Sequence, residues 1–284
     1  PNINRLAKQG TLFTNYYTAA PSTSMALTCM FSGLNAYELD RGHYAEVKPF
    51  TQSPTLFSIL QDKGYETHVI WAKYFEHMAQ RYSKIFASET KVHNLPSVAT
   101  HILAVDKGKS VIEAPENHLT IMKFYQETVE ITKNRKKPLF IWMHCPHVFN
   151  PRRCVGSDID LFDNLVGQLM SVFDGNIYLT ADHGGMIGEK NIYGYGFSVY
   201  EGVANIPLIT PNHTGRKVIG EPISSIQLKN IILDKKVHHQ EFVYSDTQYF
   251  LQPNRKLMIR KGDYKYIYNK KADSEELYDL EFDP

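Results

Sequence analysis

The sequence is poor in cysteine and has no CxxC spacing. Its three cysteines, Cys29, Cys145 and Cys154, therefore indicate neither a disulfide framework nor a cysteine zinc site. Cys145 and Cys154 are close enough along the chain to pair around a loop, and the sequence leaves that pairing open. The redox compartment of the protein stays undecided for the same reason.

The chain also lacks a charge excess and long apolar runs. Lys and Arg total 31 against 30 Asp and Glu, so bulk electrostatics gives no reason to expect a nucleic-acid partner. No apolar run approaches the roughly 20 residues that span a bilayer, and no signal-like segment opens the sequence. Hydrophobic residues make up 43% of the 284 residues, enough for the core of one large domain or of one domain with a small appendage.

Apolar periodicity predicts helices that alternate with short strands in the first three quarters of the chain. We expect helices over residues 1–10, 55–63, 118–134 and 159–173, and strands over residues 12–17, 66–71, 138–143 and 176–180. Such alternation favours an α/β fold with a mainly parallel sheet sandwiched by helices.

From about residue 216 the pattern changes to a short helix followed by strands. The predicted strands and the turn between the last two are residues 241–247, 256–261 and 264–269, with Lys261-Gly262-Asp263 as the turn. We therefore expect a catalytic α/β domain over residues 1–215. Residues 216–284 would form a small C-terminal α+β subdomain with an antiparallel sheet packed on that domain.

The segment N-I-Y-L-T-A-D-H-G-G-M-I-G-E, residues 176–189, is the most informative of the chain. An apolar strand would deliver Asp182 and His183 into a glycine-rich turn at its carboxyl end, where open α/β sheets bind ligands. A carboxylate beside an imidazole makes half of a divalent metal site, although such a pair also suits an ordinary loop. These ligand types accept zinc, manganese, magnesium or calcium, so the identity of the ion stays open.

Residues 22–24, Ser-Thr-Ser, follow a predicted strand and precede a helical pattern that starts near Met25. Hydroxyls at that place cap free backbone N–H groups, and the same N–H groups favour an anion. Capping alone would explain these residues. A Thr hydroxyl attacks well only when it is deprotonated, and a divalent cation nearby lowers its pKa enough for that.

Four motifs in order resemble the sulfatase-like branch of the alkaline phosphatase superfamily. They are P-N-I-N-R-L-A-K-Q-G-T-L-F-T-N-Y-Y-T-A-A-P at residues 1–21, T-A-D-H-G-G-M-I-G-E at 180–189, Y-E-G-V-A-N-I-P-L-I at 200–209, and R-K-G-D-Y-K-Y-I-Y-N at 260–269 with E-E-L-Y-D-L-E-F-D-P at 275–284. The match runs nearly from end to end. It implies the family's fold, with Asp182 and His183 as metal ligands.

The nucleophile loop departs from the sulfatase pattern. In that pattern a Cys, converted to formylglycine, is followed by a small residue, Pro or Ala, Ser and Arg, whereas this sequence has Thr23-Ser24-Met25-Ala26-Leu27. An unmodified Thr is what the phosphate-handling branches use, and S-T-S-M-A-L-T-C-M-F-S resembles the loop of phosphoethanolamine transferases. The resemblance therefore implies that Thr23 is nucleophile and metal ligand, and that a covalent phosphothreonine forms.

The resemblance also implies roles for five further residues. His147 matches the family's H-x-P-H region and would act as general acid, with His144 beside it on the substrate. Lys73 stands where sulfatases have a Lys that contacts the anion. Lys190 and Tyr195 stand where many relatives have His and Lys, and both would still bind a charged ester oxygen. Each of the five also suits an ordinary loop or solvated side chain.

A further acidic ligand comes, in the family, from a strand that should lie before Pro1. Either an upstream segment supplies this ligand or the metal site is incomplete. The sequence thus predicts a metal-dependent hydrolase or transferase of phosphate esters that acts through Thr23. Two alternatives stay open, namely a sulfuric ester hydrolase and a degenerate, non-catalytic protein that binds anions or glycans.

The expected partner is a phosphorylated or sulfated small molecule, glycan or lipid headgroup. Relatives with a transferase role are usually tethered to a membrane with the catalytic domain outside the cytoplasm, and sulfatases are often exported. The resemblance therefore implies an extracytoplasmic location, periplasmic or secreted.

Overall fold

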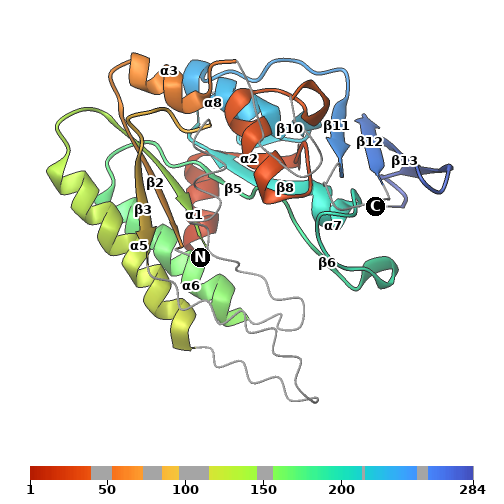
Figure 1. Cartoon of the computed structure of the whole chain (residues 1–284). Helices are drawn as coiled ribbons and strands as arrows, with labels where there is room; N and C mark the ends of the chain where they lie inside the picture. The colour runs from red at the N-terminus through yellow and green to blue at the C-terminus, as the bar shows by residue number, and fades with distance from the viewer. Residues whose placement is uncertain are drawn as a thin grey trace. The chain divides into compact units, whose positions relative to one another are not determined.

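The structure is a computed structural model of the chain, and it describes residues 1–39, 53–72, 85–95, 115–145, 156–212, 215–247 and 255–283. The chain forms two compact units. Unit 1 consists of Pro1–Ile3, Leu60–Gln80 and Ser88–Gly175, and unit 2 of Asn4–Ile59, Arg81–Ala87 and Asn176–Pro284. Helices and sheets occur in both units (Figure 1), which confirms the predicted α/β fold.

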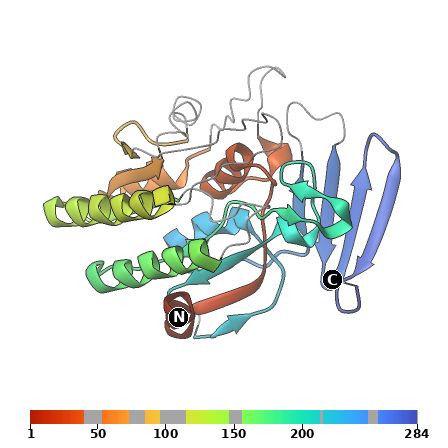
Figure 2. The same cartoon turned by 90° about the horizontal axis from the view of Figure 1, so that it is seen from below.

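Unit 1 is built on a three-stranded parallel sheet in the order β3-β2-β4. Its elements are β2 (Glu66–Ala72), β3 (Lys91–Leu95), α5 (Pro115–Asn134), β4 (Leu139–His144) and α6 (Gly156–Val172). Parallel strands of one sheet need a crossover connection. Helix α5 lies in the connection from β3 to β4, which flank β2 on its two sides. Phe124 and Ile131 of α5 share a buried core with Ile70 and Leu95 of the sheet. In both views α6 runs beside α5 (Figures 1 and 2).

Unit 2 contains a five-stranded mixed sheet centred on its first strand. The strands are β1 (Thr11–Tyr17), β5 (Leu179–Thr180), β8 (Asn205–Thr210), β9 (Val218–Ile219) and β10 (Ile223–Ser224). Strand β1 runs parallel to β9 and β10 but antiparallel to β8. The chain between β5 and β8 has no long crossover helix, and these two strands are antiparallel as well. We expected a buried strand over residues 176–180, but the structure has only the two-residue strand β5 there, and both of its residues are half buried.

Unit 2 contains the helices α2 (Thr23–Ser32), α7 (Glu201–Ala204) and α8 (Leu228–Asp234). Two further helices, α1 (Asn2–Gln9) and α3 (Leu56–Asp62), have residues in both units. Residues 25–32 of α2 are all buried, as its apolar sequence requires. Gly33 ends α2 with φ at 74° and donates its N–H to the Cys29 carbonyl. In the described part of the chain, no helix has the length and apolar character that a membrane crossing requires.

The C-terminal strands form a four-stranded antiparallel sheet (Figure 2). They are β11 (Val243–Asp246), β12 (Lys256–Lys261), β13 (Tyr264–Asn269) and β14 (Ser274–Asp279). This sheet confirms the predicted antiparallel C-terminal structure, and β12 and β13 have the predicted bounds. It packs on β1 and α7 through a buried cluster made of Tyr17, Val199, Ala204, Val243, Met258 and Ile267. The domain boundary at residue 215 stays a prediction.

Two smaller features complete unit 2. A short hairpin pairs β6 (Met186–Ile187) with β7 (Tyr193–Gly194). Among the residues that the structure describes, 3₁₀ turns occur at Ala36–Glu38, Glu189–Asn191 and Ser225–Gln227. The hairpin begins at Met186, three residues after His183 in the sequence.

A row of polar side chains links β2, β3 and α5 in unit 1. Nδ1 of His68 lies 2.9 Å from Nε2 of His93, whose Nδ1 lies 2.6 Å from Oε1 of Glu127. His68 is 4% exposed, and its Nε2 lies 3.4 Å from Glu66, which also pairs with Lys91. Burial, aided by His93, lowers the pKa of His68 below its ordinary value, although Glu66 acts in the opposite direction.

We expect mild acid to destabilise unit 1 through His68. Because the pKa of His68 is lower in the folded chain, the unfolded chain binds more protons below about pH 6.5, and the free energy of unfolding falls by up to about 1.4 kcal/mol per pH unit there. Above about pH 6.5, His68 is neutral in both the folded and the unfolded chain, so it no longer makes the free energy of unfolding depend on pH. His68→Phe should flatten the dependence in urea unfolding measured from about pH 7.5 down to about pH 5.

His239→Phe is the matched control, because His239 is exposed. This control should keep the pH dependence of the wild type. If His68→Phe kept it too, the buried histidine would not be its source.

Candidate active site

Thr23 and His183 lie side by side in unit 2, although 160 positions separate them in sequence. Thr23 is the first residue of α2, and its Oγ1 lies 3.1 Å from Nε2 of His183. Asp182 precedes His183, and its Oδ2 lies 3.4 Å from the same nitrogen. The structure therefore brings together the three residues that the sequence predicted as the centre of the site.

The loop that carries Asp182 and His183 is held from two sides. Thr18, directly after β1, donates its hydroxyl to the Asp182 carbonyl at 2.6 Å. The N–H of Gly184 donates to the Val203 carbonyl of α7 at 2.9 Å. Within the loop, Oδ1 of Asp182 accepts the N–H of His183 at 3.0 Å. Backbone contacts thus fix the position of this loop on unit 2.

The hydrogen bonds of His183 define which of its ring nitrogens carries a proton. Nδ1 lies 2.9 Å from the Gly184 carbonyl oxygen, which can only accept, so Nδ1 carries the hydrogen. In the neutral ring, Nε2 then presents a lone pair toward Thr23 and Asp182. A metal-ligating histidine usually makes this second hydrogen bond. The side chains of His183 and Asp182 are only 5% and 15% exposed, so little water competes for these atoms.

The three side chains fit part of a divalent metal site. A carboxylate oxygen, an imidazole nitrogen and a hydroxyl all suit zinc, manganese, magnesium or calcium. Across the residues that the structure describes, no three His, Cys, Asp or Glu side chains are arranged so that they could hold a metal ion together. Thr23, Asp182 and His183 would therefore hold the ion, and the further acid expected from the family is not beside them in this part of the chain.

The amino end of α2 adds backbone hydrogen-bond donors to the site. The first bond within the helix runs from the Ala26 N–H to the Ser22 carbonyl, so the N–H groups of residues 23–25 have no acceptor within the helix. Ser22 makes no capping hydrogen bond with its side chain. These donors and the positive end of the helix dipole favour a tetrahedral oxyanion next to Thr23.

Tyr195 forms part of the wall of this site, whereas Lys190 lies elsewhere in unit 2. The rings of Tyr195 and His183 have centroids 4.4 Å apart. Nζ of Lys190 donates to the Tyr278 hydroxyl at 3.0 Å and lies 5.0 Å from the ring centroid of Tyr200. Lys190, Tyr200 and Tyr278 line a cavity of about 100 Å³. Neither Thr23 nor His183 is among the residues that line it. Substrate binding by Lys190 and Tyr195 stays a prediction.

The remaining predicted site residues belong to unit 1 or lie outside the described residues. His144 is the last residue of β4 and is half buried. His147, Lys73 and Cys154 lie outside the described residues. The roles predicted for His144, His147 and Lys73 therefore stay predictions. Burial raises the pKa of the Cys145 thiol to about 12, so this thiol is a poor nucleophile.

Our sequence analysis missed Thr18 and passed over Gly184 as a turn residue. Thr18 is buried, and its hydroxyl binds the backbone of the loop rather than a ligand. The only signal in the sequence was its place between a predicted strand and the segment Ala-Ala-Pro, which gives no indication of such a contact. A Cβ on Gly184 would lie 2.3 Å from the Gly202 carbonyl oxygen. The close approach of α7 therefore requires glycine at position 184.

We expect Gly184→Ala to displace the loop and weaken the fold. Overpacking against a backbone oxygen, which cannot swing away, costs about 1–3 kcal/mol, and urea unfolding would measure it. Gly220→Ala is the matched control, since its Cβ would meet nothing nearer than Oγ1 of Thr14 at 3.8 Å. Equal free energies of unfolding in the two variants would show that the Gly202 carbonyl does not prevent a side chain at position 184.

The structure combines an α/β fold with a threonine, Thr23, at a helix amino end beside Asp182 and His183. A model of the sulfatase family matches residues 1–157, more than half of the chain. The protein therefore belongs to the sulfatase family, whose enzymes generally use a divalent metal ion. No curated protein matches the chain.

Three solved structures illustrate the likeness in fold. The phosphonate monoester hydrolase of Agrobacterium radiobacter has a TM-score of 0.73 at 14% identity, over 100% of this chain and 85% of that one. A 2-O GAG sulfatase has a TM-score of 0.71 at 14% identity, with coverage of 100% and 80%. A protein in complex with its substrate D-glucosamine-2-N,6-O-disulfate has a TM-score of 0.67 at 15% identity, with coverage of 100% and 86%. Identities this low show the fold alone.

Proposed function

We propose that the protein is a metal-dependent hydrolase or transferase of charged esters in which Thr23 is the nucleophile. The 3.1 Å contact between Oγ1 of Thr23 and Nε2 of His183 at the amino end of α2 carries the proposal. It joins a hydroxyl, a lone pair that accepts its hydrogen bond, and backbone donors for an oxyanion.

Each residue of the site has a role in the proposed reaction. The Thr23 oxygen forms a bond to the phosphorus or sulfur of the ester while the bond to the leaving oxygen breaks, and the hydroxyl proton is released to water. His147 would protonate the leaving oxygen. A divalent ion, when bound by Asp182, Thr23 and Nε2 of His183, would lower the pKa of the hydroxyl and neutralise charge on the ester.

The acceptor decides between hydrolase and transferase. Water releases phosphate or sulfate from Thr23, whereas a sugar or lipid hydroxyl would carry the group away. The helix end and its N–H groups bind the oxygens of the transferred group in both cases, so the Thr23 site supports either outcome.

The unmodified Thr favours phosphate esters, with a covalent phosphothreonine. Sulfate esters are the second candidate, because the family model and the solved complex with D-glucosamine-2-N,6-O-disulfate both concern sulfatases or sulfated sugars. The substrate would then be a sulfated glycan unit. Both candidates accord with an extracytoplasmic enzyme of this family.

We expect Thr23→Ala to reduce turnover by about 10³-fold or more, because the group that becomes covalently bonded is lost. Assays with p-nitrophenyl phosphate, bis-p-nitrophenyl phosphate and p-nitrophenyl sulfate would measure this, and the preferred ester identifies the substrate class. Thr28→Ala, one turn further along α2, is the matched control and should change turnover by less than about tenfold. Undiminished turnover in Thr23→Ala would exclude Thr23 as nucleophile.

Removing metal should abolish turnover and lower the melting temperature, since binding at a hundred times Kd stabilises a fold by about 2.7 kcal/mol. Asp182→Asn and His183→Gln should each lower the bound metal measured by elemental analysis, whereas His239→Gln should retain it. Full metal content in the first two variants would contradict the assigned ligands. Absence of both metal and turnover in the folded wild type would favour the non-catalytic alternative.

A further inference from the structure

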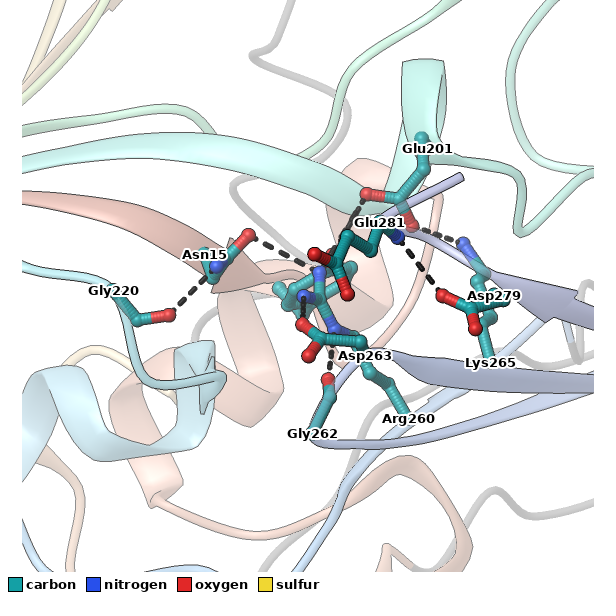
Figure 3. Close-up of polar contacts among 10 residues, drawn as sticks. Asn15, Glu201, Gly220, Arg260, Gly262, Asp263, Lys265, Asp279 and Glu281 are labelled. Atoms are coloured by element: carbon teal, nitrogen blue, oxygen red, sulfur yellow. Dashed lines mark hydrogen bonds and ion pairs between the residues drawn. The ribbon is translucent and has the colours of Figure 1, made fainter. Parts of the chain in front are cut away.

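A buried group of charged side chains joins β1, α7 and the C-terminal sheet within unit 2 (Figure 3). Lys265 of β13 is only 1% exposed, and its Nζ donates to Oε1 of Glu201 at 2.6 Å. The Tyr17 hydroxyl donates to Oε2 of the same carboxylate at 2.7 Å. Both oxygens of Glu201 are therefore engaged, one from the C-terminal sheet and one from β1.

Arg260 of β12 completes this group, which we call the Glu201 cluster and define as Tyr17, Glu201, Arg260 and Lys265. Its guanidinium is 4% exposed and donates to the Tyr17 hydroxyl, to Oδ1 of Asn15 at 3.1 Å and to the Gly262 carbonyl at 2.8 Å. Figure 3 shows it between β1 and the turn after β12.

Burial lowers the pKa of both Lys265 and Arg260, which means that the folded chain holds these charges at a cost in desolvation. A buried ion pair contributes little net stability when compared with apolar residues of similar size, so its presence is better explained by what it keeps in place. In this protein the Glu201 cluster includes the first residue of α7.

Helix α7 is the element that supports the candidate site. Its Val203 carbonyl accepts the Gly184 N–H, and its Ala204 carbonyl accepts the Thr18 N–H, each at 2.9 Å. Thr18 in turn donates its hydroxyl to the Asp182 carbonyl. Both backbone supports of the Asp-His loop therefore begin within three residues of Glu201.

We propose that Lys265 and Arg260 are positioning residues that fix Glu201, and thereby hold the Asp182–His183 loop against Thr23 through α7. The proposal rests on the proposed function of the Thr23 site. It gives the C-terminal sheet a part in the reaction through Glu201 and Tyr17, which Lys265 and Arg260 contact.

A second Lys–Glu pair in the same sheet provides a matched control. Nζ of Lys261 lies 2.7 Å from Oε1 of Glu241, and the two side chains are 67% and 68% exposed. An exposed pair of this kind is screened by water and holds little in place. Lys261→Met therefore removes the same type of charge from the same sheet without touching the Glu201 cluster.

Hydrogen exchange tests the proposal without any assumption about the reaction. The amides of Thr18 and Gly184 both donate to α7, whereas the Phe13 amide lies within β1 and reports on the sheet as a whole. In Lys265→Met we expect exchange at Thr18 and Gly184 to accelerate at least tenfold relative to Phe13, because α7 is released locally. Tyr17→Phe, which removes only one hydroxyl, should accelerate it several-fold, and Lys261→Met should leave it unchanged.

Uniform acceleration of all three amides, or none, would overturn the proposal, since the cluster would then only stabilise the fold or do nothing. If Lys265→Met does not fold, Tyr17→Phe decides the question by the same comparison. Lys265→Arg keeps the charge and should recover slow exchange at least in part. The proposed function has a separate test, because turnover that does not depend on Thr23 would sink it and leave the exchange result intact.

Discussion

The hydrogen bonds that the backbone of α7 makes to Thr18 and Gly184 are the interactions on which the rest of the site depends. They are made by carbonyls of Val203 and Ala204, whose side chains are buried. Main-chain atoms in such a core move only if the core moves with them. The separation between Thr23 and His183 is thus determined by packing, and the role proposed for Thr23 would need that precision because small misplacements are costly in rate.

The electrostatics of the site favours an anionic ester over a neutral one. The helix end at Thr23 presents partial positive charge, which attracts an anion. A cation between Asp182 and Thr23 would add to this preference. A phosphate monoester carries more negative charge than a sulfate ester, so the same site stabilises the former more strongly unless other side chains counteract it.

The sequence permitted prediction of the fold class, the Asp-His loop and the place of Thr23, because strand and helix periodicity is local and the motifs lie in single segments. The bounds of β12 and β13 were predicted correctly for the same reason. β3 and β14 were missed, since their half-polar sequences resemble loops and become strands only beside a partner. Lys265 and Glu201 are 64 positions apart, and a buried charge is not apparent before its partner is known.

Identification of a covalent adduct during turnover would test the proposed role of Thr23 as nucleophile. The enzyme would be quenched in acid during turnover of the preferred ester, digested, and its peptides sequenced by mass spectrometry. We expect a phosphoryl or sulfuryl group on Thr23 that disappears as substrate is exhausted. A peptide containing Thr23 that stays unmodified during active turnover, or a group on another side chain, would contradict it.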